Sequence, residues 1–463
     1  MAETSDLRAR RAACIGFGKA GTYVLAYLVH HGVRVTVRDE KTDHALGRSG
    51  APWETRGVTF RFGAGWLCDL DEDVLFRSPG VRPDLPPLRA AVERGAVLTG
   101  EWAYFADHYP GIFLAVTGSD GKTTTAHLAH ALLTEDGTHR AHLGGNMGLP
   151  LLTHLDGAAP DECTVAELSS FQLMTPMRPP ARAVITNISE NHLNWHRDMA
   201  EYVRAKRSLL GPDTAAVLNA ENPYTSAFAQ ERENPADCLF SSVRDTRALR
   251  AAFPGRHTIT MEEGVLHFDG APLMPLSLLR LPGVHNAENF MAALGLVYPY
   301  LSDPGRTCRA VAASFEGVRH RLEVAGRAGG VLYYNSSIDT SPTRTAAALR
   351  ALNRRPILLC GGAEKGISFA PLRAVCEQYA AAVILFGAAA GALEAALCGL
   401  SIPLCRTTGM RDAVRLAHDM AQPGDTVLLS PACTSFDEFT DFAERGDVFC
   451  AMVRDFENTE DVT

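Results

Sequence analysis

The stretch Gly118-Ser119-Asp120-Gly121-Lys122-Thr123-Thr124 decides the fold of this chain. It follows an apolar run, Ile112 to Val116, and precedes a helical pattern with apolar residues from Ala126 to Leu133 on one face. This order predicts a strand, a glycine-rich turn and the start of a helix. In such a turn, glycines let backbone N–H groups approach phosphate oxygens, and the helix N-terminus adds its positive dipole end.

The side chains of this stretch fit a nucleoside triphosphate. Lys122 would reach the outer phosphates, and the Thr123 hydroxyl would ligate Mg²⁺. The motif is shorter than the usual Walker form, so an ordinary strand-to-helix turn with a surface lysine is the alternative interpretation. We predict an ATP-binding loop made of Gly118, Ser119, Asp120, Gly121, Lys122, Thr123 and Thr124.

The composition limits the class of protein. A chain of 463 residues is too long for one core and predicts about three domains. Hydrophobic residues make up 46%, so the chain can bury large cores. The net charge of −9 argues against nucleic-acid binding, which requires a basic surface. The 11 cysteines include no C-x-x-C pair and no zinc-ligand spacing, which is typical of a reduced, cytoplasmic protein.

Two segments bear on membrane targeting. Met1 to Arg11 is polar and lacks the apolar core of a signal peptide. Ala380 to Leu400 is apolar except for Glu394, but Gly387 and Gly391 interrupt it. We therefore expect a strand followed by a short helix in this segment, and no membrane span.

A second glycine-rich turn, Gly16-Phe17-Gly18-Lys19-Ala20-Gly21, lies near the N-terminus. It follows an expected strand, Ala13 to Ile15, and Asp39 comes just after the next expected strand, Arg34 to Val37. This is the G-x-G-x-x-G arrangement of a Rossmann unit, which suggests a nicotinamide-dependent oxidoreductase. A lone fingerprint is weak evidence, and two nucleotide loops in one chain more often indicate two different nucleotides. The turn Ser78 to Val81 follows a later strand of the same expected sheet, where open sheets bind ligands.

Two polar residues of the central segment follow expected strands. Glu167 lies near the end of Cys163 to Leu168, and His192 lies beyond Ala183 to Ile188. The carboxyl ends of parallel strands face the ligand crevice, so both side chains are expected to converge on the phosphates. Taken alone, each has an ordinary alternative, a solvated carboxylate and a loop histidine with its hydrogen bonds satisfied. Lys206, on an expected helix, would alone be interpreted as a solvated lysine.

The alternation of strands and helices predicts an α/β protein of three domains. We place a Rossmann-like domain at residues 1–100 and a P-loop, parallel-sheet domain at 101–317. A hairpin turning at Glu262-Glu263-Gly264 adds a small antiparallel patch to the latter. A second doubly wound, Rossmann-like domain occupies 318–463, with expected strands at residues 331–334, 357–360, 383–386, 402–405 and 426–429.

Several motifs, in this order, resemble those of the Mur ligases, the ATP-dependent ligases of peptidoglycan precursor synthesis. They are Thr117 to Thr124, Leu143 to Gly148, Glu167 to Leu173, His285 to Asn289 and His320-Arg321. Within that family the chain is most similar to the branch that adds D-glutamate. That likeness rests on Leu429 to Asp437 with Phe439, Phe442 and Arg445-Gly446.

The resemblance implies that UDP binds the first domain, ATP the second, and the incoming amino acid mainly the third. The first glycine loop is then a site for the UDP substrate, with no nicotinamide. The residues implied for it are Gly16, Gly18, Lys19, Ala20, Gly21, Thr22, Asp39, Ser78 and Gly80. The implied substrates are UDP-N-acetylmuramoyl-L-alanine and D-glutamate, acted on by a monomer with no nucleic-acid partner.

Further roles are implied residue by residue. Asn146 would line the phosphate site, Asn289 would meet adenine, and Arg321 would reach the γ phosphate. The implied catalytic residues are Lys122, Glu167, His192, Lys206 and Arg321. The implied ligands of two Mg²⁺ sites are Thr123, Glu167, His192 and Lys206, the last as a carbamate. The implied D-glutamate contacts are Thr340, Lys365, Ser435 and Phe442.

The sequence departs from the family pattern in two places. Asn335-Ser336-Ser337-Ile338-Asp339-Thr340 stands where Asn-Asp-Ser-Lys-Ala-Thr is common, so the contact to ribose is in question. Around His192, Asn191 and Asn194 replace two aspartates. Three alternatives remain. One is a ligase of the same superfamily that adds a different amino acid or acts on a folate or a murein peptide. The others are a nicotinamide-dependent oxidoreductase and a catalytically silent nucleotide-binding subunit.

Overall fold

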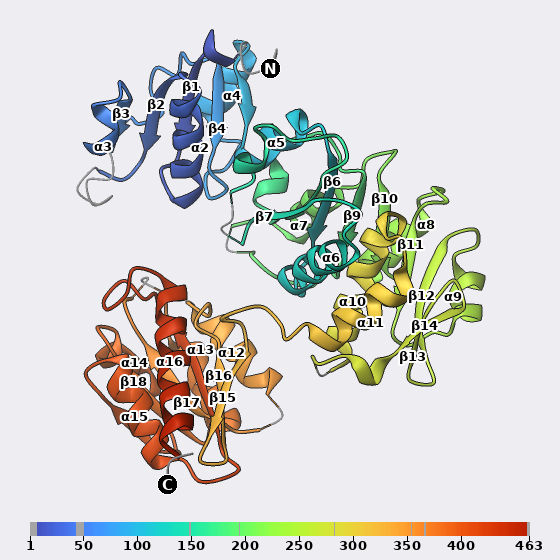
Figure 1. Ribbon diagram of the computed structural model, residues 1–463. Helices are drawn as coiled ribbons and strands as arrows, with labels where there is room; N and C mark the ends of the chain where they lie inside the picture. The colour runs from blue at the N-terminus through green and yellow to red at the C-terminus, as the bar shows by residue number, and fades with distance from the viewer. Residues whose placement is uncertain are drawn as a thin grey trace. The chain divides into compact units, whose positions relative to one another are not determined.

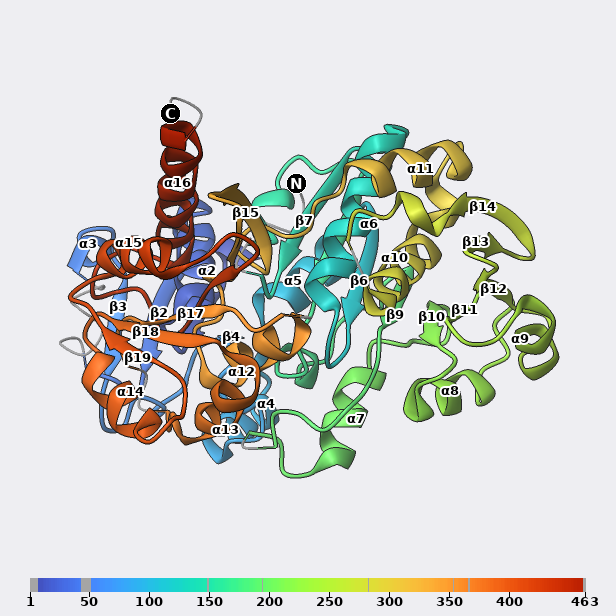
Figure 2. The same ribbon diagram turned by 90° about the horizontal axis from the view of Figure 1, so that it is seen from below.

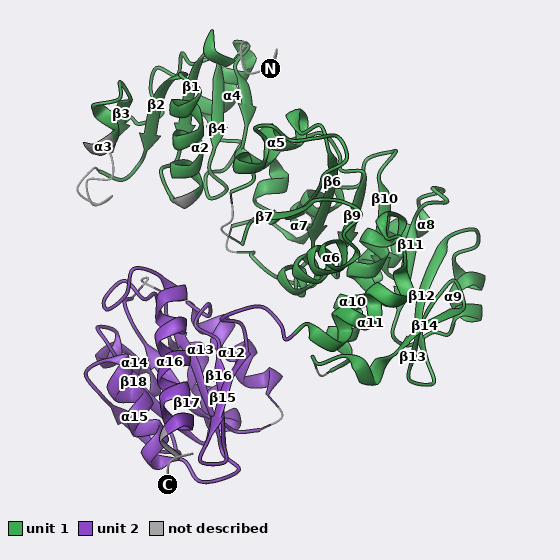
Figure 3. Ribbon diagram, in the orientation of Figure 1, with its two compact units in different colours: residues 1–315 green, residues 316–463 purple. Residues whose placement is uncertain are grey.

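The computed structural model describes residues 7–42, 51–147, 150–193, 195–281, 283–352, 354–364 and 367–460. The chain divides into two compact units, residues 1–315 and 316–463 (Figure 3). Unit 1 holds two sheets and unit 2 holds one (Figures 1 and 2).

The first sheet of unit 1 is parallel throughout, with the strand order β3-β2-β1-β4-β5. The order reverses between β1 and β4, which is where open α/β sheets bind ligands. Its strands are β1 (Arg11–Ile15), β2 (Arg34–Asp39), β3 (Thr59–Phe62), β4 (Val74–Arg77) and β5 (Val97–Thr99). Its helices are α2 (Lys19–His30), α3 (Ala51–Glu54) and α4 (Pro86–Glu93), and α5 (Glu101–His108) leads to the next sheet.

The second sheet has nine strands in the order β14-β13-β12-β11-β10-β9-β6-β8-β7. The antiparallel pairs are β12–β13, which forms the predicted hairpin, and β13–β14. The strands are β6 (Ile112–Thr117), β7 (Ala141–Gly145), β8 (Cys163–Glu167), β9 (Arg182–Ile185), β10 (Ala215–Asn219), β11 (Cys238–Ser241), β12 (His257–Glu262), β13 (Val265–Phe268) and β14 (Ala271–Pro275). Strand β6 lies between β8 and β9, third from one edge of the sheet, so the loop after β6 opens between two parallel neighbours.

Helices cover both faces of this sheet because its strands are apolar on both sides. One face packs with α6 (Lys122–Asp136), α10 (Val284–Val297) and α11 (Pro304–Ser314). The other packs with α7 (Met199–Arg207), α8 (Pro223–Gln230) and α9 (Thr246–Ala252). Successive residues of one strand divide between the two faces: Val217 packs with the first group and Leu218 with the second.

Unit 2 is built on a sheet with the order β15-β16-β20-β17-β18-β19, in which only β15 is antiparallel. Its strands are β15 (Glu323–Ala328), β16 (Val331–Asn335), β17 (Ile357–Gly361), β18 (Ala382–Phe386), β19 (Leu404–Arg406) and β20 (Thr426–Ala432). Its helices are α12 (Pro342–Ala351), α13 (Ala370–Tyr379), α14 (Ala390–Leu397), α15 (Met410–Met420) and α16 (Phe442–Glu460).

The three-part α/β architecture is confirmed, and the differences are local. The sequence did not predict β15, which pairs as an antiparallel edge strand beside β16. The expected strand Ala183 to Ile188 is shorter, because β9 ends at Ile185. The apolar segment Ala380 to Leu400 forms β18 and α14, as expected. The boundaries at 1–100, 101–317 and 318–463 stay a prediction.

Among the helices within the described ranges, none combines the length and the apolar character that crossing a bilayer requires.

Candidate functional site

The predicted phosphate loop connects β6 to α6. Its glycines are required by close packing: an ideal Cβ on Gly118 would lie 1.9 Å from the Thr186 hydroxyl oxygen. Gly121 precedes α6 with a φ of +78°, which favours glycine. The Asp120 backbone N–H donates to the Asn187 side-chain oxygen at 3.0 Å, so the loop is held from β9's side. The backbone of a P-loop is therefore present where the sequence placed it.

Lys122 folds back over this loop. Its Nζ donates to the carbonyl oxygens of Gly118 at 2.9 Å and Ser119 at 2.8 Å. Thr123 is buried in the first turn of α6. An ammonium held over the loop at a helix N-terminus is suited to anionic oxygens.

Glu167 ends β8 beside the loop. One carboxylate oxygen, Oε1, accepts from Asn146 Nδ2 at 2.8 Å, so two predicted residues meet. The other, Oε2, is buried and has no hydrogen-bond partner among the described residues. A buried carboxylate oxygen without a partner is costly, and a bound cation would compensate it. Glu167 is thus not the solvated carboxylate of the alternative interpretation.

Lys206 reaches the same loop from α7. Its Nζ donates to the Gly118 carbonyl at 2.7 Å and lies 4.7 Å from the centre of the Tyr202 ring. The side chain is 1% exposed. Burial, and secondarily the nearby Lys122 ammonium, hold the pKa of Lys206 well below its usual range. The interpretation as a solvated helix lysine is wrong, because α7 packs this side chain against the phosphate loop.

His192 is exposed and has a φ of +56°. Its ring lies 5.0 Å from that of Phe171 and 6.4 Å from that of Tyr202. No group of three or more His, Cys, Asp or Glu side chains suited to a metal occurs in the part of the chain that the structure describes. Mg²⁺ usually takes one or two carboxylates and completes its shell with phosphate and water oxygens, and the Thr123 hydroxyl and the Glu167 carboxylate are oxygen donors of that kind.

Asn289 approaches the loop from α10. Its Oδ1 accepts from Thr125 Oγ1 at 3.3 Å and would lie 2.2 Å from a Cβ at Gly121. The residue implied for adenine thus lies against the start of α6.

This contact makes Gly121→Ala a specific test of the loop. Alanine in the left-handed region costs about 1–2 kcal/mol of stability. Gly137→Ala, at the other end of α6, is the matched control, since its φ is +75° and nothing lies within 4 Å of its Cβ. We expect both variants to lose stability, Gly121→Ala somewhat more because Asn289 must also shift, and only Gly121→Ala to weaken ATP binding, by about tenfold or more. If Gly121→Ala and Gly137→Ala bound ATP with equal affinity in calorimetry, this prediction would be wrong.

A cavity of about 460 Å³ lies at the switch point of the first sheet, at the ends of β1 and β4. Among the residues expected for UDP, those lining it are Gly16, Gly18, Ala20, Asp39, Ser78 and Gly80. Gly21 and Thr22 shape the turn instead: Thr22 Oγ1 donates to the Gly18 carbonyl at 3.3 Å, and a Cβ on Gly21 would lie 2.4 Å from the Gly16 carbonyl oxygen. Lys19 begins α2.

Asp39 holds this turn directly. Its carboxylate accepts from the backbone N–H of Phe17 at 2.6 Å and of Lys41 at 2.8 Å. The sequence reasoning missed five other lining residues, Glu40, Lys41, Trp66, Arg82 and Leu85. Glu40 and Lys41 follow β2 directly, so the carboxyl-end rule applied to Asp39 could have found them.

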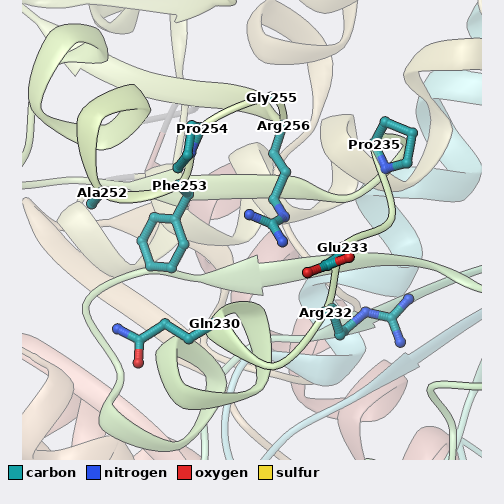
Figure 4. A pocket seen from close by; sticks show the side chains of 9 residues that line it. All are labelled: Gln230, Arg232, Glu233, Pro235, Ala252, Phe253, Pro254, Gly255 and Arg256. Carbon is teal, nitrogen blue, oxygen red and sulfur yellow. The ribbon is translucent and has the colours of Figure 1, made fainter.

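A second cavity, of about 600 Å³, lies elsewhere in unit 1 (Figure 4). Its lining residues are Gln230, Arg232, Glu233, Pro235, Ala252, Phe253, Pro254, Gly255 and Arg256. These segments precede β11 and β12, so the cavity lies at the amino ends of parallel strands. That edge is opposite to the phosphate loop, which follows the carboxyl end of β6.

In unit 2, Arg445 brings together the loops expected for the amino acid. It is buried, and it donates to Ser337 Oγ and to the Thr434 carbonyl, both at 3.0 Å. These contacts tie the loop after β16, with Thr340, to the loop after β20, with Ser435. Ser337 Oγ donates in turn to the carbonyl of Phe442. Lys365 lies outside the described residues.

Two further predicted positions are in unit 2. Arg321 is exposed. Asp339 is buried, and its Oδ2 accepts from Ser430 Oγ at 2.9 Å within unit 2. Burial raises the pKa of Asp339.

The fold and site define, first, a class: a nucleotide-binding α/β protein with a phosphate loop on one sheet and a cavity at the switch point of another. Family models then match three successive parts of the chain. They are the MurD-like N-terminal domain of Mur ligases at residues 10–100, the Mur ligase middle domain at 116–297, and the glutamate ligase domain of Mur ligases at 320–433.

Relatives and solved structures agree with these matches. The chain is 39% identical over 449 residues to the UDP-N-acetylmuramoylalanine--D-glutamate ligase of Symbiobacterium thermophilum, covering 96% of this chain and 97% of the relative. It is 37% identical over 460 residues to the ligase of that name from Ruminiclostridium cellulolyticum, with 97% of each covered. The UDP-N-acetylmuramate-alanine ligase MurC of Thermotoga maritima has the same fold, with a TM-score of 0.57, 18% identity, and 96% and 99% coverage. The chain belongs to the Mur ligase family.

Proposed function

We propose that this chain is the ATP-dependent ligase that joins D-glutamate to UDP-N-acetylmuramoyl-L-alanine in peptidoglycan precursor synthesis. The observation that carries the proposal is the 37–39% identity, over nearly the whole chain, to relatives named for that activity. The phosphate loop, with Glu167 and Lys206 packed beside it, supplies the matching chemistry for ATP.

The reaction has two steps. The L-alanyl carboxylate attacks the γ phosphorus of ATP, which forms an acyl phosphate and releases ADP. The amine of D-glutamate then attacks the acyl carbon, loses a proton, and expels inorganic phosphate to leave an amide. In the first step two anions must approach each other, so the site has to neutralise charge.

The residues of the loop meet that requirement. Lys122 and the N-terminus of α6 present positive charge to the phosphates, and Asn146 orients Glu167. Magnesium, when bound, neutralises phosphate charge and polarises the phosphoryl group. Thr123, Glu167 and His192 would hold it across two sites. The proposal assigns adenine to Asn289 and the γ phosphate to Arg321.

Lys206 acts as a carbamate in this proposal. Holding a lysine with a pKa of about 10.4 in its neutral form at pH 7 costs roughly 4.6 kcal/mol, because each pKa unit corresponds to about 1.36 kcal/mol. Burial already favours the neutral amine here, and a neutral amine reacts with CO₂ to give an anion. The carbamate replaces a charge that repels metal ions with one that binds them.

The amino-acid contacts come from unit 2. The loops of Thr340, Ser435 and Phe442, which Arg445 ties together, form the D-glutamate site with Lys365. The enzyme is a cytoplasmic monomer that acts on small molecules and has no nucleic-acid partner.

A panel of amino acids tests the substrate assignment. We measure ADP release by the purified protein with ATP, Mg²⁺ and UDP-N-acetylmuramoyl-L-alanine, adding one amino acid at a time. D-glutamate is expected to stimulate release far more than L-glutamate, L-lysine or glycine. Stimulation by another amino acid would instead support a sister ligase, and no stimulation by any would leave the assignment without support.

A further inference from the structure

Arg82 joins the cavity of the first sheet to the second sheet. It lines the cavity with Gly16 and Ser78. Its guanidinium donates to Asp84 at 2.8 and 2.9 Å and to Glu201 at 2.8 and 3.2 Å. It thus makes forked pairs with two carboxylates, one on its own turn and one on α7.

Trp195 adds a second link at this point. The Arg82 guanidinium lies 5.0 Å from the centre of the Trp195 ring and donates to its carbonyl at 2.9 Å. The indole Nε1 donates to the carbonyl of Gly80 at 3.1 Å. The wall of the cavity is therefore attached to the segment that leads into α7.

Glu201 lies in the first turn of α7 and is buried. Besides Arg82, it accepts from the Arg197 backbone N–H at 2.9 Å and contacts His196 Nδ1 at 3.3 Å. The other ring nitrogen of His196 lies 2.9 Å from Ser170 Oγ, in the segment after Glu167. These contacts, with Arg82 first, hold the pKa of Glu201 at about 2, so it is an anion throughout the working range of pH.

The rest of α7 reaches the phosphate loop. The Tyr202 hydroxyl lies 2.8 Å from Ser119 Oγ, and Lys206 Nζ lies 2.7 Å from the Gly118 carbonyl. A rigid helix thus carries Glu201 at one end and two loop contacts further along. Displacement of its first turn would move both contacts.

We propose that Arg82 is a positioning residue for the ligation reaction: through Glu201 it fixes α7, and with it Tyr202 and Lys206, against the ATP loop. The inference rests on the proposed function for its substrates. Because Arg82 also forms part of the cavity wall, the site of the first substrate and the ATP loop are both attached to α7. If Arg82 served only the UDP substrate, its replacement would change the affinity for that substrate and leave the affinity for ATP unchanged.

The experiment compares Arg82→Met and Glu201→Gln with the wild type, using ATP affinity by calorimetry and steady-state kinetics. Neither side chain touches the phosphate loop. We expect each variant to weaken ATP binding and to lower kcat at saturating substrates by about tenfold. The double variant should be no worse than the more affected single one, and Arg82→Lys should recover part of the loss.

Arg89→Ala is the matched control. Arg89 is 59% exposed and lies 3.8 Å from the same Asp84, so its loss should change nothing measured here. Thermal unfolding of every variant separates misfolding from mispositioning. Wild-type ATP affinity in Arg82→Met, or losses that add in the double variant, would overturn the inference. ATP affinity is measured without any amino acid, so its loss in the variants does not depend on the D-glutamate assignment. That assignment is tested separately, with the wild-type enzyme.

Discussion

Replacing Lys206 with alanine is expected to reduce kcat by at least about 10²–10³, the usual effect of removing one strong electrostatic contact at a reacting centre. The reason is that Lys206 Nζ contacts the phosphate loop at Gly118 and that its burial favours the neutral amine from which the carbamate forms. Small carboxylates added to Lys206→Ala should restore part of the activity, since they can occupy the space of the carbamate.

Arg204→Ala is the control for this variant, because Arg204 is an exposed residue of the same helix. It should retain full activity, and thermal unfolding should show that both variants fold. Full activity of Lys206→Ala would remove the carbamate from the mechanism. Loss of activity without any rescue, in a folded variant, would favour a purely structural role.

Glu167→Gln is expected to lower kcat by about 10²–10³ and to raise the Mg²⁺ concentration needed for half-maximal activity. The amide keeps the volume of the side chain, and its oxygen can still accept from Asn146 Nδ2. What it lacks is the negative charge at Oε2, the buried oxygen that has no partner among the described residues.

Glu135→Gln provides the comparison. Glu135 is 41% exposed on α6 and pairs with Arg306 at the surface, where a single pair contributes little. Activity measured across a range of Mg²⁺ concentrations should separate the two variants. An unchanged Mg²⁺ requirement in Glu167→Gln would argue against this carboxylate as a ligand.

Much of the fold follows from local patterns. A glycine-rich phosphate loop joins the end of a buried strand to the N-terminus of a helix, so β6 and α6 lie where the motif predicted them. The same holds for the first glycine loop between β1 and α2. Strand β15 was not predicted because its sequence, with Gly326 and Arg327, shows no alternation of apolar and polar residues. As an edge strand it pairs only with β16.

The site was less predictable, because it depends on contacts between distant segments. Glu167 could be placed from its position at the end of an apolar strand, since parallel strands share one ligand edge. Lys206 could not be recognised from helical periodicity, which shows neither the burial of its amine nor its approach to Gly118. The family resemblance predicts its role, and the packing of α7 places its amine at the Gly118 carbonyl.

Arg82 and Glu201 carried no signal that sequence reasoning could use. The capping pattern from Asp198 to Glu201 predicts only the start of a helix. Glu201 also accepts a hydrogen bond from the Arg82 guanidinium, which lies just after β4 of the first sheet. This pairing depends on how the first two sheets pack within unit 1. Charged pairs between distant segments are therefore visible only in the structure.

The most direct measurement follows oxygen atoms through the D-glutamate reaction. UDP-N-acetylmuramoyl-L-alanine carrying heavy oxygen in its L-alanyl carboxylate is incubated with ATP, Mg²⁺, D-glutamate and the protein, and the products are analysed by mass spectrometry. We expect a D-glutamyl amide product, and inorganic phosphate that carries one oxygen from the carboxylate. Unlabelled phosphate, or no D-glutamyl product, would contradict it.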